Sequence, residues 1–388
     1  MRATALILGC LLAAAPLSGA DYSLFRGDAA RSGATAEALV PPARLVWEQD
    51  SKGHYYSSPV IVNGIVVLGN VDRYVYAYYL EDGAKKWSSQ LGERIYGSSG
   101  CVTDGKVYIN AVNGCAYALE LDSGAVSLTR CVKRLTFFGS TPDILGSSLV
   151  QDGRLYVGSD NHEVYAFQLP GGQEIWSYRT GGRVHDTAPA VAGDDLFIAS
   201  TDGRIYALDK EKGTLKWRSE AYDLLNTTPA VLDGKVYFGS RDHFFRCLDS
   251  GTGKLLWSFQ TARSVMSSPV VDLASSSVVF GGADGQVYCL GLSDGALKWK
   301  YSAGGAVLAS PLLTGKTLWI GSFAGDFVAL DLMSGKELWS AVVPGGIFSS
   351  AAASQGKVVV AGKEGVLYCF QANLDQEPLP VPKKKKKK

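Results

Sequence analysis

Hydrophobic positions in this chain fall in short segments of four to six residues separated by Gly and Asp. The clearest run spans residues 187–217, where T-A-P-A-V, L-F-I-A-S and I-Y-A-L-D are each followed by a turn and Trp217 closes the unit. Segments of β-branched, aromatic and small apolar residues bounded by turn formers predict strands joined by tight hairpins. No stretch with helical apolar spacing interrupts them in the mature chain, so we predict an all-β protein.

This unit of about 40 residues recurs eight times, which is the length of one four-stranded propeller blade. An aromatic–small pair of the third strand, or its substitute, falls at Tyr76-Ala77, Tyr117-Ala118, Tyr165-Ala166, Tyr206-Ala207, Arg246-Cys247, Tyr288-Cys289, Val328-Ala329 and Tyr368-Cys369. The closing tryptophan falls at Trp87, Trp176, Trp217, Trp257, Trp299 and Trp339, with Leu128 in the second unit. We therefore predict an eight-bladed β-propeller with four-stranded antiparallel blades over residues 43–371.

The two ends of the repeat array predict how the ring closes. The eighth unit stops after its third strand at Phe370, whereas Leu45-Val46-Trp47 carries a fourth-strand signature with no third strand before it. We predict that these segments pair, so that the N-terminal strand closes blade 8 and leaves no open edge. Each docking tryptophan is expected to wedge between its own blade and the next, and Trp319, outside the register, is expected in the core.

The first 20 residues have the layout of a secretory signal peptide, with Arg2, an apolar stretch, Pro16 and small residues before Asp21. We expect residues 1–20 to be removed on export and residues 21–42 to form a leader. Only nine residues precede Cys10 and the apolar run continues past it, so we expect no lipid anchor there. The apolar stretch is too short for a membrane span and no second one follows.

Residues 372–388 combine a Pro-rich segment with Lys383–Lys388, a composition that builds no packed core. We expect a disordered tail. It is either a solvated or artificially added segment, or it makes a weak contact with an anionic surface such as lipid headgroups. Seven of the 38 basic residues are Arg2 and the six tail lysines. The rest of the chain therefore has 31 basic and 37 acidic residues and is net negative. This charge balance does not indicate nucleic-acid binding.

The pattern Ala-Leu-Asp-x3-Gly-x3-Trp at residues 207–217, repeated at 329–339, resembles the tryptophan-docking repeat of quinoprotein alcohol dehydrogenases and their non-enzymatic relatives. The resemblance covers roughly residues 43–370. In length and blade number the chain is similar to the BamB-type periplasmic propellers that assist outer-membrane protein assembly. It is also similar to quinone-binding-like repeat proteins, whose leaders often carry a phrase like Phe25-Arg26-Gly27.

For the enzymatic members, the resemblance implies a quinone beside calcium, an aspartate base and a disulfide between adjacent cysteines, all carried on insertions. Here no two cysteines are adjacent. Asp152, Asp202, Asp233 and Asp284 recur as Asp-Gly pairs, which marks them as turn formers. We expect no catalysis, cofactor or metal, and a PQQ-dependent dehydrogenase-like enzyme remains the alternative.

One face of a propeller collects the loops between blades and those between second and third strands. His54 and His185 map to the first loop type, and His162 and His243 to the second. Their spread over several blades predicts surface loop histidines rather than a shared metal site. The Leu-rich docking loop of BamB-type proteins is not found before blade 4, where this chain has residues 181–186.

The loop after Leu128 is the longest between blades, because 48 residues separate Leu128 from Trp176 where the other spacings are 40 to 42. Arginine and aromatic side chains contribute most to interface energy, so we expect this loop to bind a protein partner. An equal alternative is that its two phenylalanines plug the funnel. The predicted partner-binding residues are Lys133, Arg134, Phe137, Phe138, Arg183 and His185.

Six cysteines remain after export. Cys247, Cys289 and Cys369 occupy the small position of the third strand and are expected to be buried. Cys115 and Cys131 fall at or near cross-strand register in blade 2, which leaves a disulfide and free thiols both open, with Cys101 spare.

Together these features predict a monomeric, non-catalytic, exported scaffold that binds another envelope protein, in the periplasm or outside the cell. Envelope or outer-membrane protein assembly is the expected context. An extracellular polymer-binding propeller is a further alternative to the dehydrogenase-like enzyme.

Overall fold

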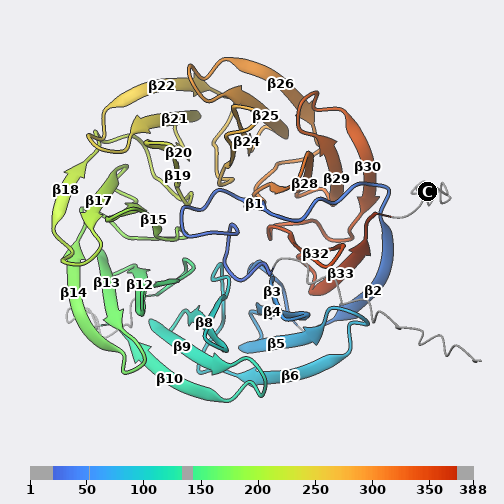
Figure 1. Ribbon diagram of the computed structural model, residues 1–388, viewed down its shortest axis with the longest axis horizontal. Helices are drawn as coiled ribbons and strands as arrows, with labels where there is room; N and C mark the ends of the chain where they lie inside the picture. Colours follow the sequence, from blue (N-terminus) through green and yellow to red (C-terminus); the bar gives the residue numbers. More distant parts are fainter. Residues whose placement is uncertain (1–20, 52, 133–142, 374–388) are drawn as a thin grey trace, which may run out of the picture.

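The computed structural model describes residues 21–51, 53–132 and 143–373, and every helix-or-strand element in these ranges is a β-strand. The strands form eight sheets arranged around a central axis (Figure 1). This confirms the predicted all-β, eight-bladed propeller. In the same ranges no helix is long and apolar enough to cross a membrane. The expected signal peptide and nearly all of the expected tail lie outside the described residues.

Blades 1 to 4 follow one another along the chain. Blade 1 comprises β3 (Val60–Val62), β4 (Ile65–Gly69), β5 (Tyr74–Tyr79) and β6 (Lys85–Gln90). Blade 2 comprises β7 (Cys101–Thr103), β8 (Lys106–Ala111), β9 (Cys115–Glu120) and β10 (Val126–Cys131). Blade 3 comprises β11 (Leu149–Gln151), β12 (Arg154–Ser159), β13 (Glu163–Gln168) and β14 (Gln173–Arg179). Blade 4 comprises β15 (Ala190–Ala192), β16 (Asp195–Ala199), β17 (Ile205–Asp209) and β18 (Leu215–Arg218).

Blades 5 to 8 complete the ring. Blade 5 comprises β19 (Ala230–Leu232), β20 (Lys235–Gly239), β21 (Phe244–Asp249) and β22 (Leu255–Gln260). Blade 6 comprises β23 (Val270–Asp272), β24 (Ser277–Gly281), β25 (Gln286–Gly291) and β26 (Leu297–Ser302). Blade 7 comprises β27 (Leu312–Thr314), β28 (Thr317–Gly321), β29 (Asp326–Asp331) and β30 (Glu337–Val342), and β1 (Ala34–Thr35) adds to it in parallel. Blade 8 comprises β31 (Ala352–Ser354), β32 (Lys357–Ala361), β33 (Val366–Gln371) and the N-terminal β2 (Arg44–Asp50).

The aromatic–small pairs are explained by the register between the third and outer strands. In each blade the small residue lies directly opposite the docking residue, as Ala207 lies opposite Trp217 and Cys247 opposite Trp257. A large residue there would meet the indole of its own blade, so the position selects Ala or Cys. Cys247, Cys289 and Cys369 are all fully buried at this position, as predicted.

The docking tryptophans join neighbouring blades, as the repeat predicts. Trp87 Nε1, for example, donates a hydrogen bond to Leu121 O in blade 2 at 2.8 Å. The same bond recurs from Trp47, Trp176, Trp217, Trp257 and Trp299. A Cβ on Gly213 would lie 2.5 Å from the Trp176 ring, and its φ is +68°, so this turn position requires glycine.

Ring closure through blade 8 is confirmed. β2 pairs antiparallel with β33, and Trp47 lies opposite Cys369. Trp47 Nε1 reaches Leu80 O of blade 1 at 3.0 Å, so the closing strand also docks on the next blade. Trp319 is fully buried on β28 and donates to Thr314 Oγ1 at 2.9 Å, which confirms its place in the core.

A belt of hydroxyl groups runs around the channel just before each innermost strand. The main-chain N–H of one blade donates to the side-chain hydroxyl at the same position of the next, as from Ser310 to Ser350 and from Ser350 to Ser58. Seven such bonds link positions Ser58, Ser99, Ser147, Ala188, Thr228, Ser268, Ser310 and Ser350. The bond missing from the belt is the one that Ala188, which has no hydroxyl, would accept.

The leader is part of the propeller rather than a separate segment, which the sequence did not indicate. It crosses the centre of the ring before entering β1 and β2 (Figure 1). Main-chain N–H groups of six innermost strands donate to its carbonyl oxygens. These donors are Ile61, Val102, Val191, Val231, Val271 and Leu313. Blade 3 is reached by Arg31 through Ser148 O, and blade 8 by Glu37 through the N–H groups of Gln355 and Gly356. The leader therefore contacts all eight blades.

Two buried arginines hold the leader in the channel. Arg26 donates to the carbonyls of Pro269 and Pro311, and Arg31 donates to Pro189 O at 2.9 Å. Both side chains are only 1% exposed, and burial lowers the pKa of each to about 10, so both stay charged at neutral pH. A Cβ on Gly33 would lie 2.1 Å from Arg26 Nη2, so glycine is required where the guanidinium crosses the chain.

Candidate functional site

The leader fills one end of the central channel. The other end, which we call the mouth, is surrounded by the loops that join one blade to the next. A cavity of about 80 Å³ lies at its centre, with Phe25 of the leader among the residues that line it. Most of the others occupy one repeat position, two residues before the hydroxyl belt: Tyr56, Gly97, Asp186, Asn226, Met266, Leu308 and Phe348. The fold thus presents one structural position from blade after blade, and the side chain differs each time.

One side of the mouth is aromatic. Tyr56 stacks on Tyr96 with ring centroids 4.4 Å apart, and the edge of Phe348 meets Tyr56 at 5.3 Å. These rings come from the loops before blades 1, 2 and 8, so ring closure is what brings Phe348 to Tyr56. Aromatic pairs of this geometry form rigid contact surface with little entropy left to lose on binding.

A neighbouring part of the mouth is charged and centres on Asp160. His185 Nδ1 lies 3.0 Å from both Asp160 carboxylate oxygens, and Arg183 Nη1 lies 3.7 Å from Oδ2. His185 Nε2 in turn lies 3.9 Å from Asp186 Oδ2. Asp160 belongs to the turn between β12 and β13, whereas the other three belong to the loop before blade 4. The two loop types predicted to share a face therefore meet here.

Burial and the charges of neighbouring residues shift the pKa values of the side chains around Asp160. The hydrogen bond to Asp160 raises the pKa of His185 despite partial burial. Burial raises the pKa of Asp186, with His185 opposing the shift. Burial, and then the charge of Asp160, raise the pKa of Asp143. Acidification therefore favours the folded form of this cluster.

Of the predicted partner-binding residues, the structure brings Arg183 and His185 together on Asp160. Lys133, Arg134, Phe137 and Phe138 lie outside the described residues. Sequence reasoning missed Asp160, Tyr56 and Phe348. For Tyr56 and Phe348 the signal was the variable position two residues before each Ser or Thr of the belt, which resembled ordinary loop variation.

The four histidines share a face but not a site. His54 Nδ1 contacts Lys363 O at 2.8 Å, while His162 and His243 adopt positive φ in second-to-third-strand turns. Over the residues that the structure describes, no three His, Cys, Asp or Glu side chains are grouped to hold a metal ion.

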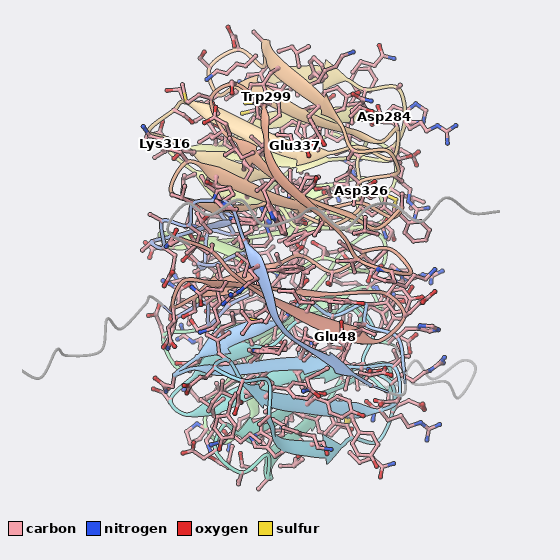
Figure 2. All side chains as sticks on the ribbon, turned by 90° about the vertical axis from the view of Figure 1, so that its right-hand side faces the viewer. Glu48, Asp284, Trp299, Lys316, Asp326 and Glu337 are labelled. Atoms are coloured by element: carbon pink, nitrogen blue, oxygen red, sulfur yellow. A yellow bond between two sulfur atoms is a disulfide. The ribbon has the colours of Figure 1, made fainter. Side chains whose placement is uncertain are left out.

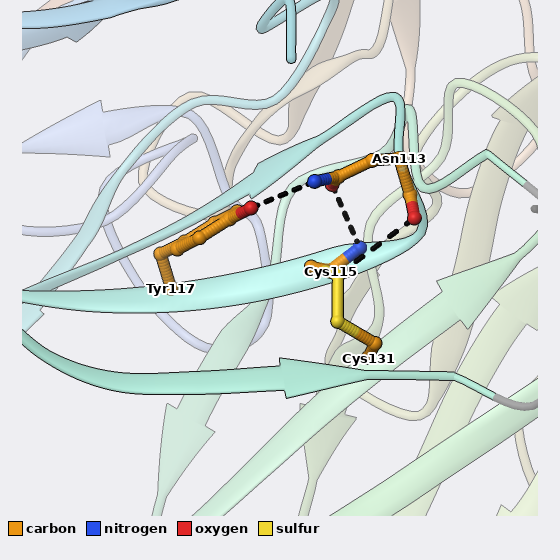
Figure 3. The surroundings of a disulfide bond; sticks show 4 residues. All are labelled: Asn113, Cys115, Tyr117 and Cys131. Carbon is orange, nitrogen blue, oxygen red and sulfur yellow. Dashed lines mark hydrogen bonds between the residues drawn. A yellow bond between two sulfur atoms is a disulfide. The ribbon is translucent and has the colours of Figure 1, made fainter. Parts of the chain in front are cut away.

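A disulfide joins the strands at the base of the long loop. Cys115 on β9 and Cys131 on β10 are directly opposite and bonded (Figure 3). Asn113 holds the turn beside it, because its side-chain oxygen accepts the Cys115 N–H and its amide donates to Tyr117 Oη. The pairing that the sequence left open is thus formed, and Cys101 is free and buried.

The fold and the tryptophan register define a PQQ-like β-propeller of the BamB type. A family model described as "Beta-alanine-activating enzyme, beta-propeller" matches residues 128–381, more than half of the chain, and the chain belongs to that propeller family. A second model, described as "Outer membrane protein assembly factor BamB", matches residues 38–159.

Two sequence relatives are named outer membrane protein assembly factor BamB. That of Burkholderia pseudomallei (strain K96243) is 24% identical over 214 residues, covering 52% of this chain and 54% of the relative. That of Shewanella oneidensis is 25% identical over 232 residues, covering 55% and 54%. The chain thus spans about half the length of the curated relatives it matches.

Solved structures show the same fold. BamB from Moraxella catarrhalis superposes with a TM-score of 0.69 at 16% identity, covering 87% of this chain and 100% of that chain. A europium-containing methanol dehydrogenase superposes with a TM-score of 0.79 at 13% identity, covering 90% and 98%. At these identities the likeness concerns the fold alone.

Proposed function

We propose that this protein is an exported, non-catalytic scaffold that binds another envelope protein at the open mouth, in the context of outer-membrane protein assembly. The single observation that carries the proposal is the asymmetry of the channel. One end is filled by the leader, while the other presents aromatic and charged side chains from successive blades. Such a mixed, rigid surface suits a protein partner. The relatives named BamB support the assembly context.

The charged side of the mouth supports binding rather than catalysis. Both ring nitrogens of His185 face carboxylates, of Asp160 and of Asp186, which favours the protonated ring. A general base needs a free nitrogen within hydrogen-bond reach of the proton it removes. His185 and Arg183 are therefore assigned to partner contact, together with the predicted Lys133, Arg134, Phe137 and Phe138.

The dehydrogenase-like alternative meets a poor fit in the mouth. Pockets for cofactor-sized ligands measure about 300–1,000 Å³, whereas the central cavity measures about 80 Å³. Calcium takes about six to eight oxygen ligands, and the described side chains form no metal-binding group. The central cavity thus does not fit a quinone with calcium. A cavity of about 430 Å³ beside Tyr96 is large enough, but its lining places Arg94 with Glu93 and Asp143 and forms no group of calcium ligands among the described residues.

Site-specific photocrosslinking in intact cells tests the proposal. A crosslinking amino acid at Phe348 or Arg183 samples the mouth, and one at Met333, exposed in the turn between β29 and β30, samples the opposite face. We expect an outer-membrane assembly protein to be captured from the mouth positions and not from Met333. Equal capture at both faces, or quinone-dependent dye reduction by the purified protein, would contradict the proposal.

A further inference from the structure

The central cavity of the mouth is small and shielded from solvent. Its volume is about 80 Å³, and each of its lining residues is buried or half-buried. One water molecule needs about 10–15 Å³ of such a volume, so the cavity has room for the end of a side chain. Phe25 of the leader lies among the lining residues and closes the cavity from the leader's side.

Two hydrogen-bond acceptors without donors line this cavity from adjacent blades. Asn226 Oδ1, in the loop between β18 and β19, is buried and has no hydrogen-bond partner among the described residues. Asp186, in the loop between β14 and β15, accepts no hydrogen bond within the described ranges, and its Oδ2 lies 3.9 Å from His185 Nε2. An unpaired buried acceptor costs free energy, so both groups favour a donor brought from outside.

The environment of Asp186 favours a donor that carries a positive charge. Burial raises the pKa of its carboxyl, because the ionised form is poorly solvated there. The charges of His185 and Arg241 lower this pKa and that of Asp160 raises it, and the net shift stays upward. A cation in direct contact would stabilise the ionised carboxylate.

A carboxylate at the rim of the same face differs, because its own blade supplies donors. Asp284, in the turn between β24 and β25, accepts hydrogen bonds from Tyr288 Oη at 2.7 Å and from the Ala262 N–H at 3.1 Å. Figure 2 shows Asp284 on one face of the ring and Lys316 on the other. Asp186 has no such donors, so its acceptor capacity is left for a ligand in the cavity.

The rest of the lining suits an alkyl stem that ends in a cation. Met266 and Leu308 are apolar, and Tyr56 meets the edge of Phe348 with ring centroids 5.3 Å apart. Methylene groups pack on apolar surface while the charged end reaches a polar group. The face of an aromatic ring attracts an ammonium group within about 6 Å.

We propose that the central cavity binds the ammonium group of a lysine side chain on the partner protein. An ammonium carries three donors on one atom, so it can donate to Asp186 and to Asn226 Oδ1 together. The planar guanidinium of arginine is wider and suits a bidentate fork better than a cavity of about 80 Å³. The inference names the group that holds the partner, and in that respect it rests on the proposed function.

Binding of Nα-acetyl-lysine amide to the purified full chain, followed by saturation-transfer NMR, tests the proposal. Nα-acetyl-norleucine amide is the matched control, because it has the stem without the ammonium, and Nα-acetyl-arginine amide tests the shape of the cation. We expect saturable binding of the lysine derivative and at least tenfold weaker binding of both controls. Equal or tighter binding of either control would overturn the proposal.

Variants locate the site. Asp186→Asn keeps the side-chain shape, and asparagine tolerates the φ of 54° at this position, so the variant should fold and weaken lysine binding at least tenfold. Asn226→Leu removes the unpaired oxygen and should weaken binding without lowering the melting temperature. Asp326→Asn makes the same change of charge outside the cavity lining (Figure 2) and should leave binding unchanged. Unchanged binding in both cavity variants would overturn the proposal.

The inference and the proposed function fail separately. Capture of an envelope protein at Phe348 without binding of the lysine derivative would overturn the inference and leave the proposed function standing. Binding of the lysine derivative without any capture in cells would support the assignment of the cavity and contradict the proposed function. When both hold, Asp186→Asn should also reduce capture at Phe348, and Asp326→Asn should not.

Discussion

The two ends of the channel are built by different rules. At the closed end the leader meets main-chain groups of the innermost strands, which are nearly the same in every blade, so its contacts recur around the ring. At the open mouth the blades present side chains at a shared position, and these differ from blade to blade. Contacts that hold the ring together are thus concentrated where the repeats are alike, and the proposed partner-binding side chains lie where the repeats differ.

The comparison also explains two buried charges. Arg26 and Arg31 would be costly in a channel without partners, yet carbonyls at the starts of the innermost strands receive them. Those carbonyls come from blades 3, 4, 6 and 7, so each guanidinium ties separate blades together. At the mouth, blades are joined by side chains instead, as where His185 contacts Asp160 and where Tyr56 meets Phe348.

Deleting residues 43–49 should have the largest effect, because it removes most of β2, the strand that closes blade 8. The lost burial of Trp47 alone is worth about 5 kcal/mol before entropy is counted. We expect loss of the cooperative unfolding transition, followed by circular dichroism during heating. An unchanged melting temperature would show that blade 8 does not depend on the N-terminal strand.

Replacing Arg26 should weaken the closed end selectively. Arg26→Met leaves the carbonyls of Pro269 and Pro311 without this donor, which should cost about 2–4 kcal/mol of unfolding free energy. Phe348→Ala, at the mouth, is the matched control and should cost less, because Phe348 is only partly buried. Urea denaturation measures the free energy of unfolding of both variants. A larger loss for Phe348→Ala than for Arg26→Met would contradict the proposed difference between the two ends of the channel.

The disulfide stiffens the mouth side of blade 2. Cys115→Ser with Cys131→Ser opens a loop closed over a sequence separation of 16 residues, worth about 3 kcal/mol by loop entropy. Because β9 and β10 stay paired through the rest of their register, the measured loss should be no larger than this. Unfolding of wild type with and without reductant provides the check, and a loss that exceeds the deletion of residues 43–49 would be unexpected.

The smallest effect concerns pH. Because Asp160 raises the pKa of His185 in the folded state, the stabilising contribution is complete below the unfolded value of about 6.5 and is lost as pH rises through the folded value. The His185→Gln variant should therefore be less stable than the wild type at low pH, and the difference in stability between the two proteins should shrink as pH rises above about 6.5. Melting temperatures of the two proteins from pH 5.5 to 8.5 measure this, and a deficit that grows with pH would have the wrong sign.

The ring could be predicted from the sequence because its determinants are local and repeated. A docking Trp, a small residue opposite it and a turn glycine beneath the previous indole recur at fixed spacing, so each copy corroborates the others. The disulfide was left open because a β-bulge between Val126 and Leu128 shifts the register by one residue. Such a shift depends on the fold and is not visible in the spacing.

The leader and the mouth could not be predicted in the same way. The leader is bound by main-chain groups that are far away in the sequence, so no pattern of side chains indicates its partners. Phe25-Arg26-Gly27 was the part of the leader that the sequence singled out. At the mouth, Tyr56 and Phe348 are separated by nearly the whole chain, and ring closure alone makes them neighbours. The position of Arg183 and His185 at the mouth could be predicted because their loop type was already assigned to that face.

Hydrogen–deuterium exchange of the intact protein tests the contrast between the two ends most directly. If the leader is an integral part of the ring, the N–H groups of Val191, Val231 and Val271, which donate to leader carbonyls, should exchange as slowly as the rest of the innermost strands β15, β19 and β23, while the loop at 181–186 exchanges faster. Exchange of these three N–H groups as fast as that loop would contradict the account, because their hydrogen bonds to the leader would not be holding in solution.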